Sequence, residues 1–226
     1  MRTLVAEQSK ASTLVIACGA IAHELLAVSK ANDWQHLDIQ CLPAHWHNTP
    51  QKITPAIQAR IEQYKTQYQK IFIAYADCGT GGQLDTLLTK HGIQRLPGDH
   101  CYSFFAGQSH FDAMAEAELG TFYLTDYLAE HFQRLVMDGL GITAHPELQG
   151  EYFRHYTRLL YLRQDPNARQ APSRLENAKA AADALNLTLE VRDTGLEPFA
   201  QSLTPIHVEF KVLRPSSEQT KAICPN

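Results

Sequence analysis

The sequence lacks the features that mark membrane, secreted and nucleic-acid-binding proteins. No segment approaches the roughly 18 uninterrupted apolar residues of a membrane-spanning helix. Residues 1–10 carry charges at Arg2, Glu7 and Lys10, where a secretory leader would be apolar. Basic residues do not gather beside aromatic ones, and the formal net charge is -4. We therefore expect a cytoplasmic protein whose partner is neither a membrane nor a nucleic acid.

The sequence also has few cysteines, and no two of them form a C-x2-C clip. The chain holds 5 cysteines in 226 residues. In a protein without signs of secretion, cysteines are more often thiols or ligands than disulfides, because the cytosol is reducing. The length and the hydrophobic content of 44% are enough to bury a core without disulfides.

Apolar runs and helical patterns alternate along the first half of the chain. The runs are rich in β-branched residues, as strands are, and the segments between them have the 3.6-residue period of helices. The predicted strands are 13–17, 37–42, 70–75 and 93–96, and the predicted helices are 20–31, 54–68 and 83–91, with Thr54 as an N-cap. This alternation indicates βαβ units with a parallel sheet.

The second half predicts a smaller lobe. Its helices are expected at 104–118, 124–135, 147–156 and 173–185, and its strands at 158–162 and 187–192. We therefore predict an α/β protein with a Rossmann-like lobe at residues 1–102, a helical and α/β lobe at 103–197, and a C-terminal tail at 198–226. Prolines and polar residues suggest that this tail, which includes Cys224, is loosely held.

Four cysteines fall where predicted strands end. Cys18, Cys41, Cys78 and Cys101 each lie at or just beyond such an end. Parallel strands place their carboxyl ends on one edge of the sheet, where ligands of open α/β sheets bind. We interpret the four as a metal site at that edge, because zinc and iron prefer thiolate and imidazole ligands. The alternative is that they are small apolar residues of the core.

Histidines near these cysteines could complete the site. His45 and His47 are two residues apart, so both would point to one side of an extended loop, and His100 is adjacent to Cys101. We expect zinc as the metal, with iron or an iron-sulfur cluster as the alternatives. The other interpretation leaves these imidazoles exposed, with Trp46 anchoring the loop.

A glycine-rich loop, Asp77-Cys78-Gly79-Thr80-Gly81-Gly82, follows the third predicted strand. It leads into a helix, so the amides of Gly79, Thr80 and Gly81 could bind an anionic cofactor. The loop fits no complete nucleotide-binding fingerprint, and glycines for a tight turn are the alternative. Cys78 could instead be a nucleophile, because a thiol at a helix N-terminus is shifted toward thiolate. Its base would then be His47 or His100.

Several motifs occur in order along most of the chain: Ala17-Cys18-Gly19, Leu42-Pro43-Ala44 with His47-Asn48-Thr49-Pro50, Tyr75-Ala76-Asp77-Cys78-Gly79-Thr80-Gly81, His100-Cys101-Tyr102 and Gly120-Thr121-Phe122-Tyr123-Leu124-Thr125-Asp126. In these motifs the sequence resembles the DUF1638 family, over roughly residues 14 to 195. The resemblance implies that the thiols of Cys18, Cys78 and Cys101 belong to the family pattern, and it implies Cys41 less strongly. It names no reaction, but it implies a link with corrinoid-dependent methyltransferases, whose genes often lie beside those of such proteins in methylamine or betaine metabolism.

These observations lead to one expected function and two alternatives. We expect a metal-binding enzyme or accessory factor in corrinoid-dependent methyl transfer or one-carbon metabolism, whose partner is a small-molecule substrate or a corrinoid protein. One alternative is a module that binds a small ligand or a corrinoid without a catalytic metal. The other is a metal-free enzyme with Cys78 as nucleophile and His47 or His100 as base. The sequence leaves open whether the protein is a homo-oligomer.

Overall fold

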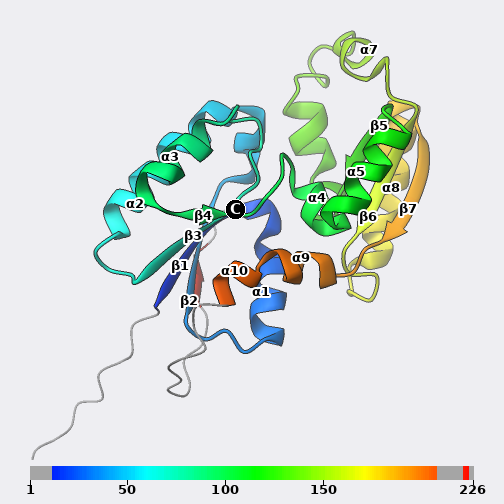
Figure 1. The fold of residues 1–226 in the computed structure, drawn as a ribbon. Helices are drawn as coiled ribbons and strands as arrows, with labels where there is room; N and C mark the ends of the chain where they lie inside the picture. Colours follow the sequence, from blue (N-terminus) through cyan, green and yellow to red (C-terminus); the bar gives the residue numbers. More distant parts are fainter. Residues whose placement is uncertain (1–11, 208–220, 224–226) are drawn as a thin grey trace, which may run out of the picture.

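The computed structural model describes residues 12–207 and 221–223, which form two α/β lobes (Figure 1). The first lobe contains five strands: β1 (Thr13–Cys18), β2 (Leu37–Leu42), β3 (Lys70–Ala74), β4 (Gln94–Arg95) and β8 (Lys221–Ile223). They form a parallel sheet in the order β4-β3-β1-β2-β8. The predicted α/β class, with a Rossmann-like parallel sheet in the first lobe, is confirmed.

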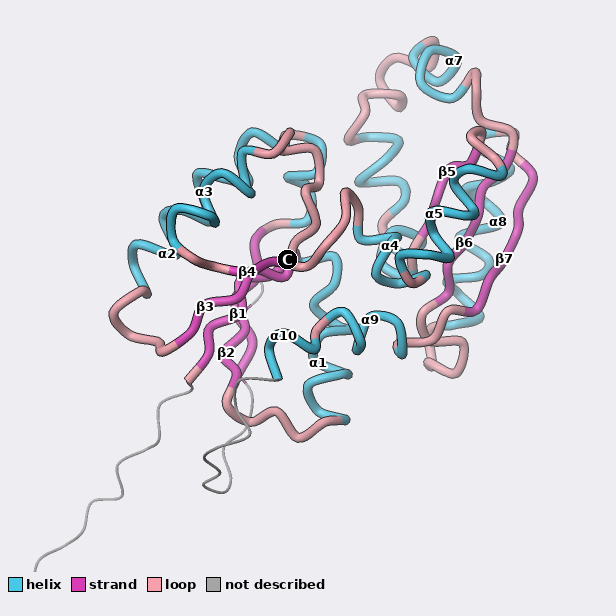
Figure 2. Tube along the Cα trace, in the orientation of Figure 1, coloured by secondary structure: helices cyan, strands magenta, loops and turns pink. Residues whose placement is uncertain are grey.

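Helices cover both faces of the first sheet, which explains why β1 is buried along its whole length. Figures 1 and 2 show α2 (Ile53–Tyr64) and α3 (Gln83–His91) on one face and α1 (Ala22–Ala31) on the other. Strands that are covered on both faces need apolar residues at every position rather than at alternate ones. The run of apolar residues from 14 to 18 meets this requirement.

Most of the predicted helix boundaries differ from those observed, and three of the differences change the reading of the chain. The predicted N-cap at Thr54 is wrong: α2 begins at Ile53, directly after the 3-10 turn η3 (Pro50–Lys52), and has no side-chain cap. The predicted helix 104–118 is divided at Gly107, whose φ of 82° ends α4 (Cys101–Ala106) before α5 (Gln108–Ala117) begins. The predicted helix 124–135 is α6 (Asp126–Glu130) followed by the π-helix η4 (Gln133–Asp138).

The second lobe contains a three-stranded parallel sheet in the order β5-β6-β7. Its strands are β5 (Thr121–Leu124), which the sequence analysis did not predict, β6 (Arg158–Arg163) and β7 (Thr188–Asp193). Helices α7 (Leu148–Phe153) and α8 (Ala171–Leu185) complete the lobe. The Asp126 carboxylate, 1% exposed, accepts hydrogen bonds from the Tyr161 hydroxyl at 2.7 Å and the Arg174 guanidinium at 3.0 Å, and so ties α6 to β6 and α8.

The chain returns to the first lobe after β7, where the sequence analysis expected a loosely held tail. Helices α9 (Glu197–Ser202) and α10 (Thr204–His207) lie beside α1 (Figure 1). Phe199, Leu203 and Ile206 are each 0% exposed and belong to the core of the first lobe. The apolar side chains of this segment explain the difference, because prolines at helix starts do not prevent packing. Cys224 lies outside the described residues.

Within residues 12–207 and 221–223, no helix is long and apolar enough to cross a membrane.

Candidate functional site

Three free cysteines from separate segments lie at one edge of the first sheet. Cys18 ends β1, Cys78 lies in the loop after β3, and Cys101 begins α4. Cys18 is 4% exposed and Cys78 is 7% exposed. The pKa of Cys101 is raised in part by the charges that Cys78 and Cys18 would carry as thiolates, so the three sulfurs share one environment.

Burial makes these thiols hard to ionise. It raises the pKa of Cys18 to about 12, although the Ala20 amide donates to its sulfur at 3.3 Å. Burial also raises the pKa of Cys101 well above its usual range, and the nearby charges of Cys78, Cys18 and Glu24 add to the effect. A buried thiolate without a positive partner is unfavourable. Without a cation, Cys18 and Cys101 are therefore neutral thiols at physiological pH.

His47 is the imidazole that joins the cysteines. The residue has an exposed side, but its Nδ1 atom faces the protein, 2.7 Å from the Ala44 carbonyl oxygen and 3.9 Å from the Cys18 sulfur. Because a carbonyl only accepts hydrogen bonds, Nδ1 carries the hydrogen and Nε2 is left with a lone pair. Loss of water around the ring lowers the pKa of His47, but a hydrogen bond with Cys78, the charge of Cys78 and the Ala44 carbonyl outweigh it, so the pKa is raised overall.

The loop that carries His47 is fixed from the second lobe. The 3-10 segment η2 (Ala44–Asn48) follows β2, and the Asn48 side-chain amide donates to the Leu135 carbonyl of the π-helix at 2.9 Å. A Cβ atom on Gly139 would lie 2.0 Å from the Asn48 amide nitrogen, so this contact requires glycine there. His47 is therefore positioned where the two lobes meet.

Tyr75 belongs to the same group, although the sequence analysis did not single it out. It is 1% exposed, and its ring is stacked with that of His47 at 6.5 Å between centroids. Its buried hydroxyl lies beside the Cys18 thiol and has no other hydrogen-bond partner. Burial, with the charges of Cys18 and Cys78, raises the Tyr75 pKa well above its usual range. The register pairs Ala17 with Ala74, so Tyr75 follows β3 beside Cys18.

Glu24 is a second residue near the site that the sequence pattern did not identify as a site residue. It lies on α1 and is only 8% exposed, and its Oε2 atom has no hydrogen-bond partner. Burial raises its pKa to about 7, and the charges of Asp126 and Glu130 raise it further while that of Arg174 lowers it. A buried carboxyl group thus separates the thiols from the ionic network of the second lobe. The helical pattern around Glu24 could not reveal this, because the charges that act on it come from α6 and α8, far along the chain.

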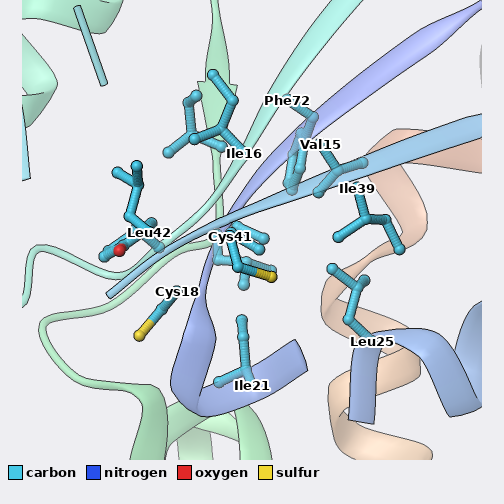
Figure 3. Close-up of a cluster of buried hydrophobic side chains, with 14 of the residues drawn as sticks. Val15, Ile16, Cys18, Ile21, Leu25, Ile39, Cys41, Leu42 and Phe72 are labelled. Atoms are coloured by element: carbon cyan, nitrogen blue, oxygen red, sulfur yellow. The ribbon is translucent and has the colours of Figure 1, made fainter. Parts of the chain in front are cut away.

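Cys41 is not part of this group. The parallel register pairs Ala17 with Cys41 and Cys18 with Leu42, so the Cys41 side chain lies on the opposite face of the sheet from Cys18. Figure 3 shows the two sulfurs pointing in different directions. Cys41 is also disulfide-bonded, and it therefore offers no thiol.

Two predicted histidine ligands lie apart from the thiols. His45 is exposed, and its ring packs edge-on against Trp46 at 6.4 Å. His100 is exposed and lies 6.0 Å from the Tyr102 ring. The structure therefore brings Cys18, Cys78, Cys101 and His47 together and leaves His45 and His100 outside.

In the glycine-rich loop, the hydrogen-bond donors bind a carboxylate of the loop itself. The Asp77 carboxylate accepts hydrogen bonds from the Thr80 hydroxyl at 2.5 Å and from the amides of Gly81 and Gly82 at 3.0 Å each. Although burial raises the Asp77 pKa, these bonds and Arg95 outweigh it and lower the pKa overall. The amides that were expected to bind a cofactor at Gly79, Thr80 and Gly81 are thus partly used by Asp77.

Cys78 itself has an uncommon backbone conformation. Its φ is 52°, in the left-handed region that non-glycine residues seldom occupy. The Cys78 amide donates to the Asp99 carbonyl at 2.8 Å, and the Asp77 amide donates to the Gly98 carbonyl at 3.0 Å, so neighbouring segments hold the turn in place. Backbone strain of this kind is concentrated at functional sites.

The side chains are not arranged as a finished coordination sphere. In the part of the chain that the structure describes, no three His, Cys, Asp or Glu side chains are grouped closely enough to hold a metal ion. The thiols and His47 are neighbours that a metal would have to draw together by side-chain rotation.

The fold and this group define a class: a two-lobed parallel α/β protein with buried thiols and an imidazole at the strand ends. The family model described as "Protein of unknown function (DUF1638)" matches residues 41–203. The chain therefore belongs to the DUF1638 family. The match includes Cys78, Cys101 and His47 and begins after Cys18. No curated protein and no solved structure matches the chain.

Replacement of Asp77 tests whether its carboxylate stabilises the loop of Cys78. Asp77→Asn should lower the free energy of unfolding by about 1–2 kcal/mol at pH 7, because charge-assisted hydrogen bonds are lost. The folded-state pKa of Asp77 is lowered, so its contribution is present above the unfolded pKa and is lost as the pH falls through the folded pKa. Urea denaturation at pH 7 and at about pH 3 measures the difference.

The control for this experiment is Asp183→Asn, which changes an exposed carboxylate on α8. It should alter the free energy of unfolding by less than about 0.5 kcal/mol. A difference between wild type and Asp77→Asn that does not shrink at acid pH would contradict the assignment.

Proposed function

We propose that Cys18, Cys78, Cys101 and His47 bind a thiophilic divalent metal ion, with zinc as the first choice. The observation that carries the proposal is that two free thiols from separate segments, Cys18 and Cys78, lie beside the His47 imidazole, while a third, Cys101, is near enough for their charges to raise its pKa. Three cysteines and one histidine are a common ligand set for zinc. Histidine ligands of metals usually donate their other ring N–H to a carbonyl, as Nδ1 of His47 does to Ala44.

Electrostatics gives an independent reason for a cation here. Burial raises the cost of ionising both Cys18 and Cys101, and the charges of Cys78 and Cys18 raise it further at Cys101, so neither becomes a thiolate alone. A divalent ion supplies the positive charge that three neighbouring thiolates lack, and it releases their protons on binding. The site would thus be neutral without metal and become anionic with it.

The same arrangement favours a single ion over an iron-sulfur cluster. A cluster needs four thiolates, and Cys41, the fourth cysteine at the strand ends, lies on the other face of the sheet in a disulfide. Zinc or a mononuclear iron needs only the three thiols and His47. Free thiols at Cys18, Cys78 and Cys101 suit the cytoplasmic location that we propose, whereas the disulfide of Cys41 is uncommon in a reducing compartment.

Metal analysis of the protein purified without a histidine tag tests the proposal. We expect about one equivalent of zinc per chain. Cys18→Ser, Cys78→Ser and Cys101→Ser should each weaken zinc binding at least about tenfold, whereas His145→Asn, with a side chain that is 65% exposed, should leave it unchanged. Zinc affinity should also fall as the pH is lowered, because protons compete for the thiols.

Circular dichroism would show whether each serine variant is folded. Less than about half an equivalent of any transition metal, together with free alkylation of all three thiols, would contradict the proposal.

A metal-free nucleophile at Cys78 is the second candidate. It is favoured by the strained backbone of Cys78, with φ of 52°, and by the hydrogen bond that links Cys78 to His47. In this arrangement, His47 would take the thiol proton and the Ala44 carbonyl would hold the ring in place. Cys18 and Cys101 would remain protonated and unreactive, because burial raises the pKa of each thiol.

Selective alkylation distinguishes this candidate from the first. In protein treated with a chelator, iodoacetamide should modify Cys78 before Cys18 and Cys101, and His47→Asn should slow that reaction at least about tenfold. His100→Asn is the matched control, because His100 is exposed and lies outside the group. Peptide mass spectrometry measures each rate, and equal modification of all three cysteines would argue against the nucleophile.

We also propose a reaction class, methyl transfer from a corrinoid to a small thiol. Its support is the family resemblance together with the chemistry of the site, in which a bound metal would activate a thiol. In the step, the carbon–cobalt bond of a methylcorrinoid breaks and leaves its electron pair on cobalt. A carbon–sulfur bond forms to the substrate thiol, whose proton goes to solvent.

Spectroscopy of methylcobalamin with dithiothreitol tests the reaction class. Zinc-loaded protein should convert the methylcobalamin spectrum, while Cys78→Ser protein should not, because the substrate thiol would have no activating metal. A corrinoid spectrum that is retained after desalting without conversion would indicate a binding module instead. No conversion and no retained corrinoid would contradict both.

A further inference from the structure

Strand β7 is an exposed edge of the second sheet. It is the last strand in the order β5-β6-β7, and every residue of it except Leu189 is exposed. Val191, an apolar β-branched residue, is 43% exposed. Figure 1 shows β7 on the outer side of the lobe, away from the strand ends that carry the candidate site. An open edge of this kind is a template for pairing with another strand.

The hydrogen bonds to β6 define which backbone groups of β7 face outward. The Thr188 amide donates to the Thr157 carbonyl at 3.2 Å, and the Thr194 amide donates to the Arg163 carbonyl at 2.9 Å. Because strand residues alternate in direction, the even-numbered residues of β7 bond to β6. The N–H and C=O groups of Leu189, Val191 and Asp193 therefore point away from the sheet.

We propose that β7 pairs with β7 of a second copy of this chain, in an antiparallel arrangement with Val191 opposite Val191. This register uses the outward groups of both strands, because it also places Leu189 opposite Asp193. A two-fold axis through the Val191 pair makes the contact isologous and closed. Two three-stranded sheets then become one six-stranded sheet.

Charged side chains favour this register of the two β7 strands over the registers shifted by two residues. With Val191 at the axis, Glu190 lies opposite Arg192 of the second copy, and the pair occurs twice. A shift by two residues in one direction places Glu190 opposite Glu190, and a shift in the other places Arg192 opposite Arg192. Directly opposed unlike charges stabilise a sheet and like charges destabilise it. The side chain of Glu190 is 49% exposed despite its 3.0 Å contact with Arg158, so it can accept a second guanidinium.

The proposal is independent of the metal site, since β7 lies in the other lobe from Cys18 and Cys78. The partner is a second copy of the same strand, which is complementary to itself. The sequence Leu189-Glu190-Val191-Arg192-Asp193 supplies both halves of each contact.

Sedimentation velocity of the wild-type protein, at protomer concentrations from about 1 µM to 1 mM, tests the pairing. We expect a dimer whose fraction rises with concentration. Val191→Pro should abolish it, because proline removes an outward N–H group and leaves the bonds to β6 intact. Arg192→Glu should weaken it at least about tenfold, because two carboxylates would then oppose each other across the strand pair.

Mixing two charge variants provides the control for folding. Glu190→Arg and Arg192→Glu should each be monomeric alone, and their equimolar mixture should dimerise, because each arginine then faces a glutamate. A wild-type chain that stays monomeric up to about 1 mM, or a dimer that survives both Val191→Pro and Arg192→Glu, would overturn the proposal. A monomeric wild-type chain would mean that β7 pairs with a strand of another protein. A dimer that survives both substitutions would mean that the dimer interface lies elsewhere.

Discussion

The cost of burying three thiols side by side without a positive charge is the constraint on which this structure depends. Burial raises the pKa of Cys18 to about 12, and the charges of neighbouring thiolates raise that of Cys101. His47 lies beside Cys18 and Cys78: loss of water around its ring lowers its pKa, but the hydrogen bond with Cys78 and the charge of Cys78 raise it overall. Cys18 and Cys101 are therefore stable as neutral thiols, and a bound cation would favour their thiolate forms.

The two lobes act on this site from opposite sides. Asn48 attaches the His47 loop to the Leu135 carbonyl of the π-helix, while Glu24 on α1 faces the charges of Asp126 and Arg174. The acceptor for the Asn48 amide is thus a backbone carbonyl of the π-helix in the second lobe. The position of the His47 loop and the charge around Glu24 consequently depend on residues of the second lobe.

Much of the fold could be predicted from local patterns, whereas the composition of the site could not. The alternation of strands and helices correctly indicated a parallel sheet with Cys18 and Cys78 at its carboxyl edge. Cys41 also lies near the end of a strand. However, the register pairs it with Ala17 and not with Cys18, and side chains alternate between the two faces of a sheet, so Cys41 faces the other way. The role of Asp77 was equally hidden, because its bonds to Gly81 and Gly82 depend on the shape of the turn.

From β1 to β4 the sequence by itself determined the order of strands and helices, because hydrophobic period and turn residues act over a few positions of the chain. It also placed Cys18, Cys78 and Cys101 near one edge of a sheet. Only the tertiary structure decided which groups meet there: it selected His47 over His45 and His100, added Tyr75, and buried Glu24. The physical reason is that burial and contact are properties of segments far apart in the chain, whose packing no local pattern specifies.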